Sequence, residues 1–166
     1  MNSIFTRRSV RNYQDKPVET EKIEQMLKAA MQAPSAGNQR PWEFIVVNDK
    51  DLLQKLSLLS PFAGPIQRAA LAIVMLANRD NMKYPENWQM DLSAATQNLL
   101  IEAVELGLGA VWLGVAPLED RMEYIKQLLD LPNNILPFAV VPVGYPATEN
   151  RFIDRYEHAK VHHDKY

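Results

Sequence analysis

Apolar residues in this chain follow helical spacing in some segments and form short continuous runs in others. Helical spacing first appears after Thr20, which is expected to cap a helix that ends before Pro34. A second amphipathic helix is predicted over 118–129, and Asp49 is expected to cap a short helix over 50–59. In the first helix the 3.6-residue period is carried by Ile23, Met26, Leu27, Ala30 and Met31. Each helix should pack one apolar stripe against a core.

Four apolar runs predict β-strands, at 42–47, 69–77, 110–115 and 138–143. The run over 69–77 has no polar position, which is typical of a strand buried on both faces. In the last run Pro142 indicates an edge strand or a strand end, because proline cannot donate a hydrogen bond to a sheet. Helices alternating with buried strands predict three layers with the sheet in the middle. The spacing alone favours parallel strands.

The segment 89–106 differs from the other helices because it is apolar on nearly every side. Such a helix belongs at the centre of the molecule or in a subunit interface. Residues 78–88 are expected to form a polar loop, and residues 146–166 lack core periodicity and are expected to form an extended arm. No repeat or interdomain linker interrupts the pattern, so residues 1–166 are expected to form a single domain.

The composition supports one globular domain, with 47% hydrophobic and 23% charged residues. The net charge of −2 gives no general attraction to nucleic acid. No window approaches the ~18 uncharged apolar residues that span a membrane. The chain has no cysteine, which excludes disulfides, zinc–thiolate sites, iron–sulfur clusters and thiol nucleophiles. Without an apolar signal-peptide core, we expect a cytoplasmic protein that has neither nucleic-acid nor membrane partners.

Several familiar motifs are absent. In G-L-G-A-V-W-L-G, residues 107–114, Trp112 occupies the position of the third glycine of a dinucleotide motif, and the glycines lead into a strand. No P-loop sequence occurs, and Ser35 lacks the glycines of a nucleophile elbow. The histidines lie at the polar C-terminus and are interpreted as solvated, not as metal ligands: His158, His162 and His163. We therefore assign no catalytic residue and no metal ligand.

A basic cluster remains at Arg7-Arg8-Ser9-Val10-Arg11. Guanidinium groups make bidentate contacts with phosphate, and a serine hydroxyl adds another donor at the same place. These residues are candidates for binding a local anionic ligand. The alternative interpretation is a solvated basic terminus, which is the more common fate of such clusters.

The connector between the first helix and the first strand, A-P-S-A-G-N-Q-R-P-W, is the second feature that remains. Pro34 stops the helix, and the small residues 35–37 expose backbone to close approach. Asn38 and Gln39 offer donors and acceptors, which suits an amide-rich heterocycle. An ordinary turn-forming connector explains the same residues equally well.

Taken in order, these segments resemble the FMN-dependent nitroreductase family. The resemblance rests on R-R-S-x-R, A-P-S-A-x-N-x-x-P-W, D-L-S-A-A-T-Q-N-L-L, E-L-G-L-G-A-V-W-L-G, V-G-Y-P and the late D-R-Y. It implies an α+β, three-layer α/β/α fold with a mainly antiparallel sheet, which replaces the parallel arrangement. It also implies a homodimer with two FMN sites, each made from both subunits, and a C-terminal arm over 146–166 that extends over the partner.

The resemblance also assigns site residues. The FMN phosphate and the polar edge of the flavin would be bound by Arg7, Arg8, Ser9 and Arg11, with Arg155 approaching the phosphate from the arm. The flavin would be lined from the other subunit by Pro34, Ser35, Ala36 and Asn38. Leu113 and Gly114 would lie near the isoalloxazine ring, where glycine permits close backbone approach.

The activity implied by the resemblance is hydride transfer from NADH or NADPH through bound FMN to a nitroaromatic, a quinone or a similar electron-poor acceptor, with donor and acceptor using one pocket in turn. Enone reduction, reductive dehalogenation and oxidative flavin breakdown are alternatives on the same scaffold. Two further alternatives are a flavin-binding or sensing protein with little turnover and a flavin-free globule whose basic cluster binds an acidic partner.

The chain departs from the family pattern in two places. It lacks a helical insertion that covers the substrate side of the flavin, so Tyr84 and Trp88 either wall a more open pocket or simply anchor a surface loop. At 62–65, Phe-Ala-Gly-Pro stands where many relatives carry a lysine or other polar group. The choice between NADH and NADPH and the class of acceptor therefore stay open.

Overall fold

A computed structural model describes residues 3–166, which fold around one central five-stranded sheet formed by their own strands. The strand order is β1-β2-β5-β3, β4 also pairs with β5, and the strand pairs are antiparallel. The mainly antiparallel prediction is confirmed, and the parallel arrangement favoured by spacing is wrong. The strands are β1 (Trp42–Val47), β2 (Leu71–Asn78), β3 (Gly109–Ala110), β4 (Leu113–Gly114) and β5 (Ile135–Gly144).

The connection between β1 and β2 shows why spacing misleads. The last residue of β1, Val47, pairs with Ala72 near the start of β2. The chain between them carries two short helices but re-enters the sheet at the end where it left, so it makes no crossover. A pattern of alternating helices and strands does not indicate at which end of the sheet the next strand begins.

Two strand predictions need correction. β5 pairs with β2 on one side and with β3 and β4 on the other, so the edge-strand alternative for Pro142 is wrong, and Pro142 lies two residues before the end of β5. The predicted strand 110–115 is divided into β3 and β4, with Val111 and Trp112 outside both. The Trp112 ring packs on Phe138 of β5 at a centroid distance of 5.4 Å, where the chain passes from β3 to β4.

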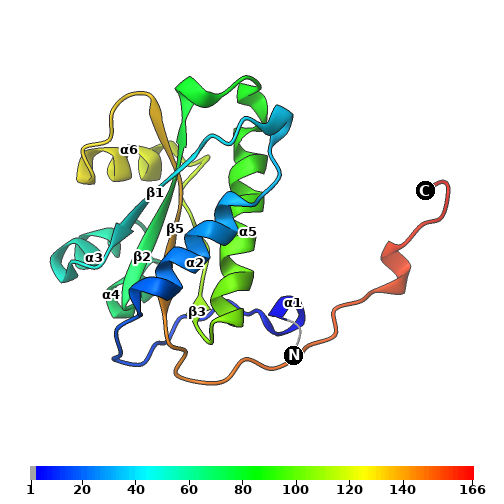
Figure 1. Cartoon of the computed structure of the whole chain (residues 1–166), viewed down its shortest axis with the longest axis horizontal. Helices are drawn as coiled ribbons and strands as arrows, with labels where there is room; N and C mark the ends of the chain where they lie inside the picture. The colour runs from blue at the N-terminus through cyan, green and yellow to red at the C-terminus, as the bar shows by residue number, and fades with distance from the viewer. Residues whose placement is uncertain (1–2) are drawn as a thin grey trace.

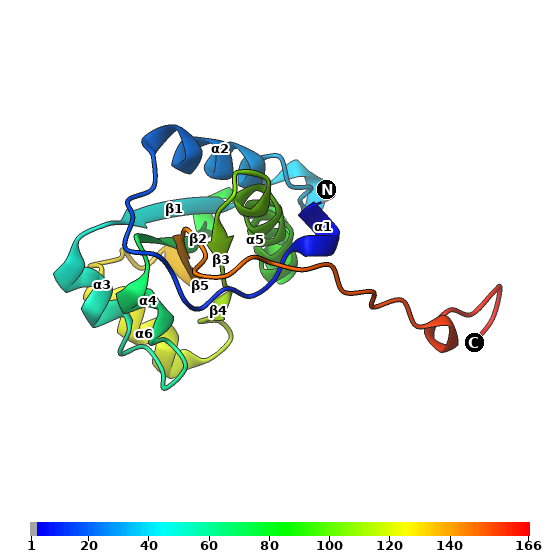
Figure 2. The ribbon, with the colours of Figure 1, turned by 90° about the horizontal axis from the view of Figure 1, so that it is seen from below.

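Helices cover both faces of the sheet, as Figures 1 and 2 show. On one face α2 and α5 enclose an apolar cluster, and on the other face α3, α4 and α6 enclose a second one. The three-layer prediction is therefore confirmed. The helices are α1 (Ser3–Thr6), α2 (Thr20–Met31), α3 (Lys50–Leu56), α4 (Pro65–Arg68), α5 (Trp88–Glu105) and α6 (Glu119–Leu128), with 3₁₀ turns η1 (Ala36–Asn38), η2 (Arg79–Asn81), η3 (Pro85–Asn87) and η4 (His158–Lys160).

The predicted helix caps have mixed outcomes. Asp49 caps α3 as predicted, since its side chain accepts a hydrogen bond of 2.8 Å from the Leu52 amide. Thr20 is already helical, and Glu19 precedes α2 instead. The Tyr145 hydroxyl donates to the Glu19 carboxylate at 2.6 Å and lowers its pKa. A charged carboxylate beside the N-terminus of α2 interacts favourably with the helix dipole and so stabilises the helix.

α5 is the central helix of the molecule. It packs against α2 and against the sheet, with Leu92, Ala95, Leu99 and Ala103 fully buried. This position explains why its sequence is apolar on most sides. In residues 3–166 no helix is long and apolar enough to cross a bilayer.

The chain after β5 forms an extended tail. Residues 151–166 are exposed along their whole length, and only η4 is regular within them. Figures 1 and 2 show the tail leaving the body next to α1 and running away from it. The extended shape agrees with the sequence, and the extension over a partner stays a prediction.

Candidate active site

The basic N-terminal segment is fixed along the edge of the sheet. After α1 the chain runs beside β3, where Ser9 bridges to Ala110 and the Val10 amide donates to the Ala110 carbonyl at 3.0 Å. The Val10 side chain is buried, whereas Ser9 and Arg11 are exposed. A methyl group at Gly109 would lie 2.7 Å from Val10, so glycine is needed for this close approach. The segment is therefore an ordered part of the fold.

Arg7, Arg8 and Arg155 line one pocket of about 420 Å³ between α1 and the tail, together with Asp154 and Gln97. Partial burial and the charges of Arg155 and Arg8 lower the pKa of the Arg7 guanidinium. The group still keeps its charge at neutral pH, because arginine is not deprotonated in proteins. The structure thus brings together two arginines distant in the sequence, at a place where a bound anion would relieve their repulsion.

Arg8 has a different set of contacts. Its Nη1 donates to the Arg7 carbonyl at 2.6 Å, and its Nη2 donates to the Arg151 carbonyl at 2.5 Å. The rings of Phe5 and Phe152 meet beside this link at a centroid distance of 5.9 Å. Arg8 therefore ties the start of the tail to the N-terminal segment, so part of its donor capacity serves the protein backbone.

A second pocket, of about 490 Å³, contains Arg11, Leu113 and Gly114, all of them predicted site residues. A methyl group built on Gly114 would have no atom within 4 Å, so the backbone there is open to a ligand. Arg68 and Arg121 line the same pocket, and Arg121 Nη1 donates to the Gly114 carbonyl at 2.9 Å. These two arginines were not predicted from the sequence, because no motif marks them and their convergence depends on how α4 and α6 pack.

The loop between α2 and β1 is held in an unusual conformation. Gly37, Asn38 and Arg40 have φ angles of 52°, 55° and 47°, in the left-handed region. Asp91 of α5 fixes this loop, since its carboxylate accepts hydrogen bonds from the Ala36 amide at 2.9 Å and from Gln39 Nε2 at 2.5 Å. Only 4% of Asp91 is exposed. Buried carboxylates are rare unless they are paired in this way.

The same loop is joined to the segment before α5. Gln39 Oε1 accepts from the Tyr84 amide at 2.9 Å, and Gln39 Nε2 also donates to the Tyr84 carbonyl at 3.2 Å. A methyl group at Gly37 would lie 2.4 Å from the Tyr84 ring. The Tyr84 ring, and not a ligand, therefore makes the close approach to the Gly37 backbone. Trp88 packs edge-on against Phe138 at 5.9 Å and anchors the start of α5.

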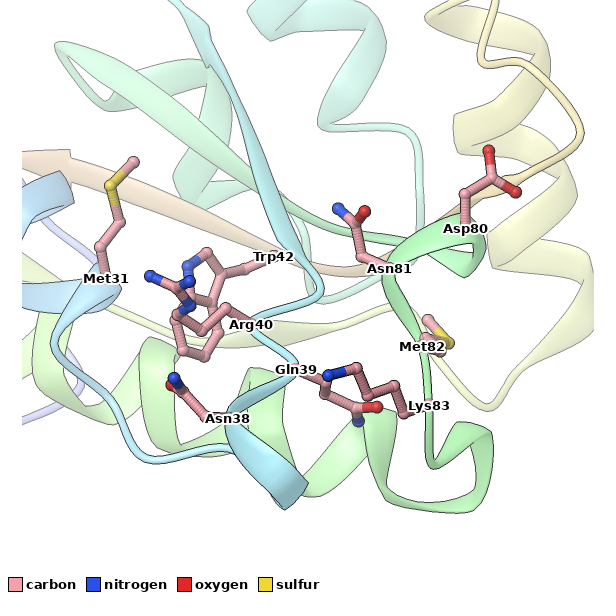
Figure 3. Close-up of a pocket in the computed structure, with 9 residues that line it drawn as sticks. All are labelled: Met31, Asn38, Gln39, Arg40, Trp42, Asp80, Asn81, Met82 and Lys83. Atoms are coloured by element: carbon pink, nitrogen blue, oxygen red, sulfur yellow. The ribbon is translucent and has the colours of Figure 1, made fainter.

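A third pocket, of about 690 Å³, lies between these two segments (Figure 3). Asn38 is the one predicted site residue in it. Gln39, a candidate donor and acceptor in the sequence, also lines it. The other lining residues were not predicted from the sequence: Met31, Arg40, Trp42, Asp80, Asn81, Met82 and Lys83.

The predicted site residues fall at opposite ends of α5. Ala36 contacts Asp91 in the first turn of α5, whereas α1 contacts the other end, where Ser3 Oγ donates to Glu105. Positions 91 and 105 are 14 residues apart, which is about 21 Å along a helix axis. Within one chain, the 34–38 loop and α1 therefore lie toward opposite ends of α5, and the pocket of Arg7 and Arg155 reaches the middle of this helix at Gln97.

Known proteins match this chain over nearly its whole length. A family model described as "Nitroreductase family" matches residues 4–60 and 62–145. A protein of Archaeoglobus fulgidus, provisionally described as an NADH dehydrogenase/NAD(P)H nitroreductase, is 46% identical over 170 residues. The match covers 100% of this chain and 98% of the Archaeoglobus protein.

Two solved structures have the same fold. An FMN-dependent nitroreductase from Clostridium difficile superposes with a TM-score of 0.91 at 33% identity, over 99% of both chains. A provisionally assigned nitroreductase from Desulfovibrio desulfuricans, solved in complex with FMN, gives a TM-score of 0.84 at 27% identity, over 99% of this chain and 95% of the other. The family model, the 46% identity and the shared fold together show that the chain belongs to the nitroreductase family of oxidoreductases.

Proposed function

We propose that the protein is an FMN-dependent oxidoreductase that moves a hydride from NADH or NADPH, through bound flavin, to a nitroaromatic, a quinone or a similar electron-poor acceptor. The observation that carries the proposal is the meeting of Arg7 and Arg155 in one pocket, where their charges repel each other. A phosphate group is the ligand that two converging guanidinium groups suit best. FMN has a phosphate at one end and a flat, hydrogen-bonding ring at the other.

The residues present fit both parts of FMN. Arg7 and Arg155 would hold the phosphate together with Arg8, which lines the same pocket, and Ser9 follows Arg8 in the chain without lining that pocket. Leu113 and Gly114 would lie against the ring, because the backbone at Gly114 is open and has room for close approach. When bound, FMN itself supplies the hydride chemistry, so the protein needs no nucleophile or metal.

The cations around Gly114 have a distinct role in this proposal. Arg11, Arg68 and Arg121 line the pocket that would hold the ring. Positive charge near the ring would favour the reduced flavin, which carries more negative charge than the oxidised flavin. Because Arg121 Nη1 already donates to the Gly114 carbonyl, Arg121 would also hold the backbone in place beneath the ring.

We further propose that the functional unit is a homodimer. The 34–38 loop is bonded to the first turn of α5 and α1 to its last turn, and this arrangement supports a flavin site that takes its loop residues from a second chain. A second copy would supply Pro34, Ser35, Ala36 and Asn38 to the flavin held by the first. The extended tail, with its exposed residues 151–166, would lie over that copy.

The test is spectroscopic. The purified protein is expected to hold flavin, to bleach on anaerobic addition of NADH or NADPH, and to recover its absorbance on addition of a nitroaromatic or a quinone. Bound flavin that neither nucleotide bleaches would favour a binding or sensing protein of this fold. A colourless protein that takes up no FMN would refute both flavin functions.

A further inference from the structure

The pocket between the 38–42 loop and residues 80–83 is the largest of the three described above, at about 690 Å³, and the proposed flavin contacts use only one of its residues, Asn38. Its size is that of a site for a small organic ligand. Figure 3 shows that its walls come from the end of α2, the loop before β1 and the segment after β2.

Arg40 is held at this pocket by a strained backbone. Its φ of 47° is left-handed, a conformation that is unfavourable for a residue with a side chain. The Arg40 amide donates to Ser35 Oγ at 3.0 Å, and the preceding residue, Gln39, is fixed by Asp91. Strain that the surroundings enforce in this way is typical of functional sites. The loop therefore fixes the position from which the Arg40 side chain enters the pocket.

Lys83 provides a second cation in the same pocket. Its neighbour Tyr84 is bound to Gln39 through two hydrogen bonds, so Lys83 is also carried by an anchored segment. In Figure 3 the Lys83 side chain extends toward the loop that carries Gln39. Among residues 3–166, no ion pair joins Arg40 or Lys83 to a carboxylate.

The remaining walls suit a ligand with flat apolar parts. Met31, Trp42 and Met82 supply apolar surface, and Asn38 and Asn81 supply amides. Asp80 is the acidic residue in the lining. Its Oδ2 accepts from Asn134 Nδ2 at 2.6 Å, and Figure 3 shows the carboxylate directed away from Arg40 and Lys83. The pocket thus combines two unpaired cations with apolar surface.

We propose that this pocket holds the phosphate-bearing part of the NADH or NADPH donor, with Arg40 and Lys83 contacting its phosphates. The inference rests on the proposed function, in which a dinucleotide enters in every turnover. Asn38, which would line the flavin of the other subunit, also lines this pocket, so the pocket adjoins the flavin site. Guanidinium and ammonium groups bind phosphate by charge-assisted hydrogen bonds, and the apolar wall suits a base or nicotinamide ring.

The test compares hydride donors with and without phosphates, using the FMN-loaded protein. The variants are Arg40→Gly, in which glycine also relieves the left-handed strain, Arg40→Gln as a second replacement, and Lys83→Met. Lys55→Met, in α3 on the opposite face of the sheet, removes the same charge as a control. The donors are NADH, NADPH and reduced nicotinamide riboside, which has no phosphate.

We expect each pocket variant to raise KM for NADH and NADPH about tenfold with kcat little changed, because binding common to ground state and transition state is lost. KM for reduced nicotinamide riboside and the Kd of FMN should stay within twofold, and Lys55→Met should behave like the wild type. Unchanged KM for both nucleotides would overturn the assignment, as would an equal rise for all three donors. A rise confined to KM for a carboxylated acceptor would assign the cations to the acceptor instead and refute the proposal.

Failure of the proposed function gives a different result. If FMN is bound and none of the three donors reduces it in the wild type, the oxidoreductase function itself is refuted, and with it the inference. If the wild type is reduced normally and only the nucleotide KM values fail to respond to the variants, the function stands and the assignment of this pocket falls.

Discussion

Replacing Asp91 by asparagine should loosen the loop that carries Arg40 and lower the free energy of unfolding. The Asp91 carboxylate accepts from the Ala36 amide and from Gln39 Nε2 with separate oxygens. Asparagine keeps one acceptor oxygen and places an NH₂ group, which cannot accept, against the other donor. Gln39 cannot rotate to compensate, because its amide oxygen and nitrogen already pair with the Tyr84 backbone.

The expected loss has two parts. One hydrogen bond to a charged acceptor contributes about 1.5–3 kcal/mol. A negative charge in the first turn of a helix contributes about 0.3–1 kcal/mol. The sum is a loss of about 2–4 kcal/mol for Asp91→Asn. Asp120→Asn is the matched control, because Asp120 is exposed in the first turn of α6 and its replacement removes only the second part.

Urea unfolding of both variants and the wild type, followed by circular dichroism at one fixed FMN concentration, measures this difference. The midpoint should fall clearly further for Asp91→Asn than for Asp120→Asn, with the same dependence of free energy on urea. Equal shifts in the two variants would show that Asp91 contributes only its charge at a helix end, and the reasoning about the loop would be refuted.

Three further changes have defined outcomes. Arg7→Ala and Arg155→Ala should each weaken FMN binding by more than about 1 kcal/mol in fluorescence titration, the scale of a charge-assisted hydrogen bond, and unchanged affinity in both would contradict the phosphate assignment. Gly109→Ala should cost about 1–3 kcal/mol of stability by thermal unfolding, because the new methyl group would lie 2.7 Å from the valine packed there. Tyr145→Phe should remove the hydrogen bond that is the first cause of the lowered Glu19 pKa. A lowered folded-state pKa stabilises the protein at pH values above the unfolded-state pKa, and this stabilisation is lost as the pH falls through the folded-state pKa. The difference in urea midpoint between wild type and variant should therefore be largest near pH 7 and should disappear in acid. A difference that increases in acid would contradict this.

Local patterns were enough to predict the four longer helices and the family, but not the four-residue helices α1 and α4. The apolar segment 89–106 agrees with α5 to within one residue at each end, because its length and composition leave few alternatives. The ordered motifs identified the family, and with it the antiparallel sheet that spacing alone had missed. Both results depend on residues close together in the sequence.

Contacts between distant segments could not be predicted in this way. Asp91 and Gln39 are 52 positions apart, and in the sequence Asp91 is an ordinary acidic residue near the start of a helix. Arg68 and Arg121 meet in one pocket only because α4 and α6 lie on the same face of the sheet. The left-handed backbone at Arg40 also has no local signal, since arginine has no preference for that conformation.

The link between Arg8 and the start of the tail bears on how truncated forms of this protein should be interpreted. Ending the chain at residue 150 would remove the Arg151 carbonyl that accepts from Arg8, the Phe152 ring that packs on Phe5, and Arg155. Loss of flavin in such a truncated form would therefore combine damage to the pocket proposed to hold the phosphate with loss of the tail. Ending the chain after Glu157 keeps all three groups and removes only the distal residues, so it tests separately whether those residues contribute to flavin binding.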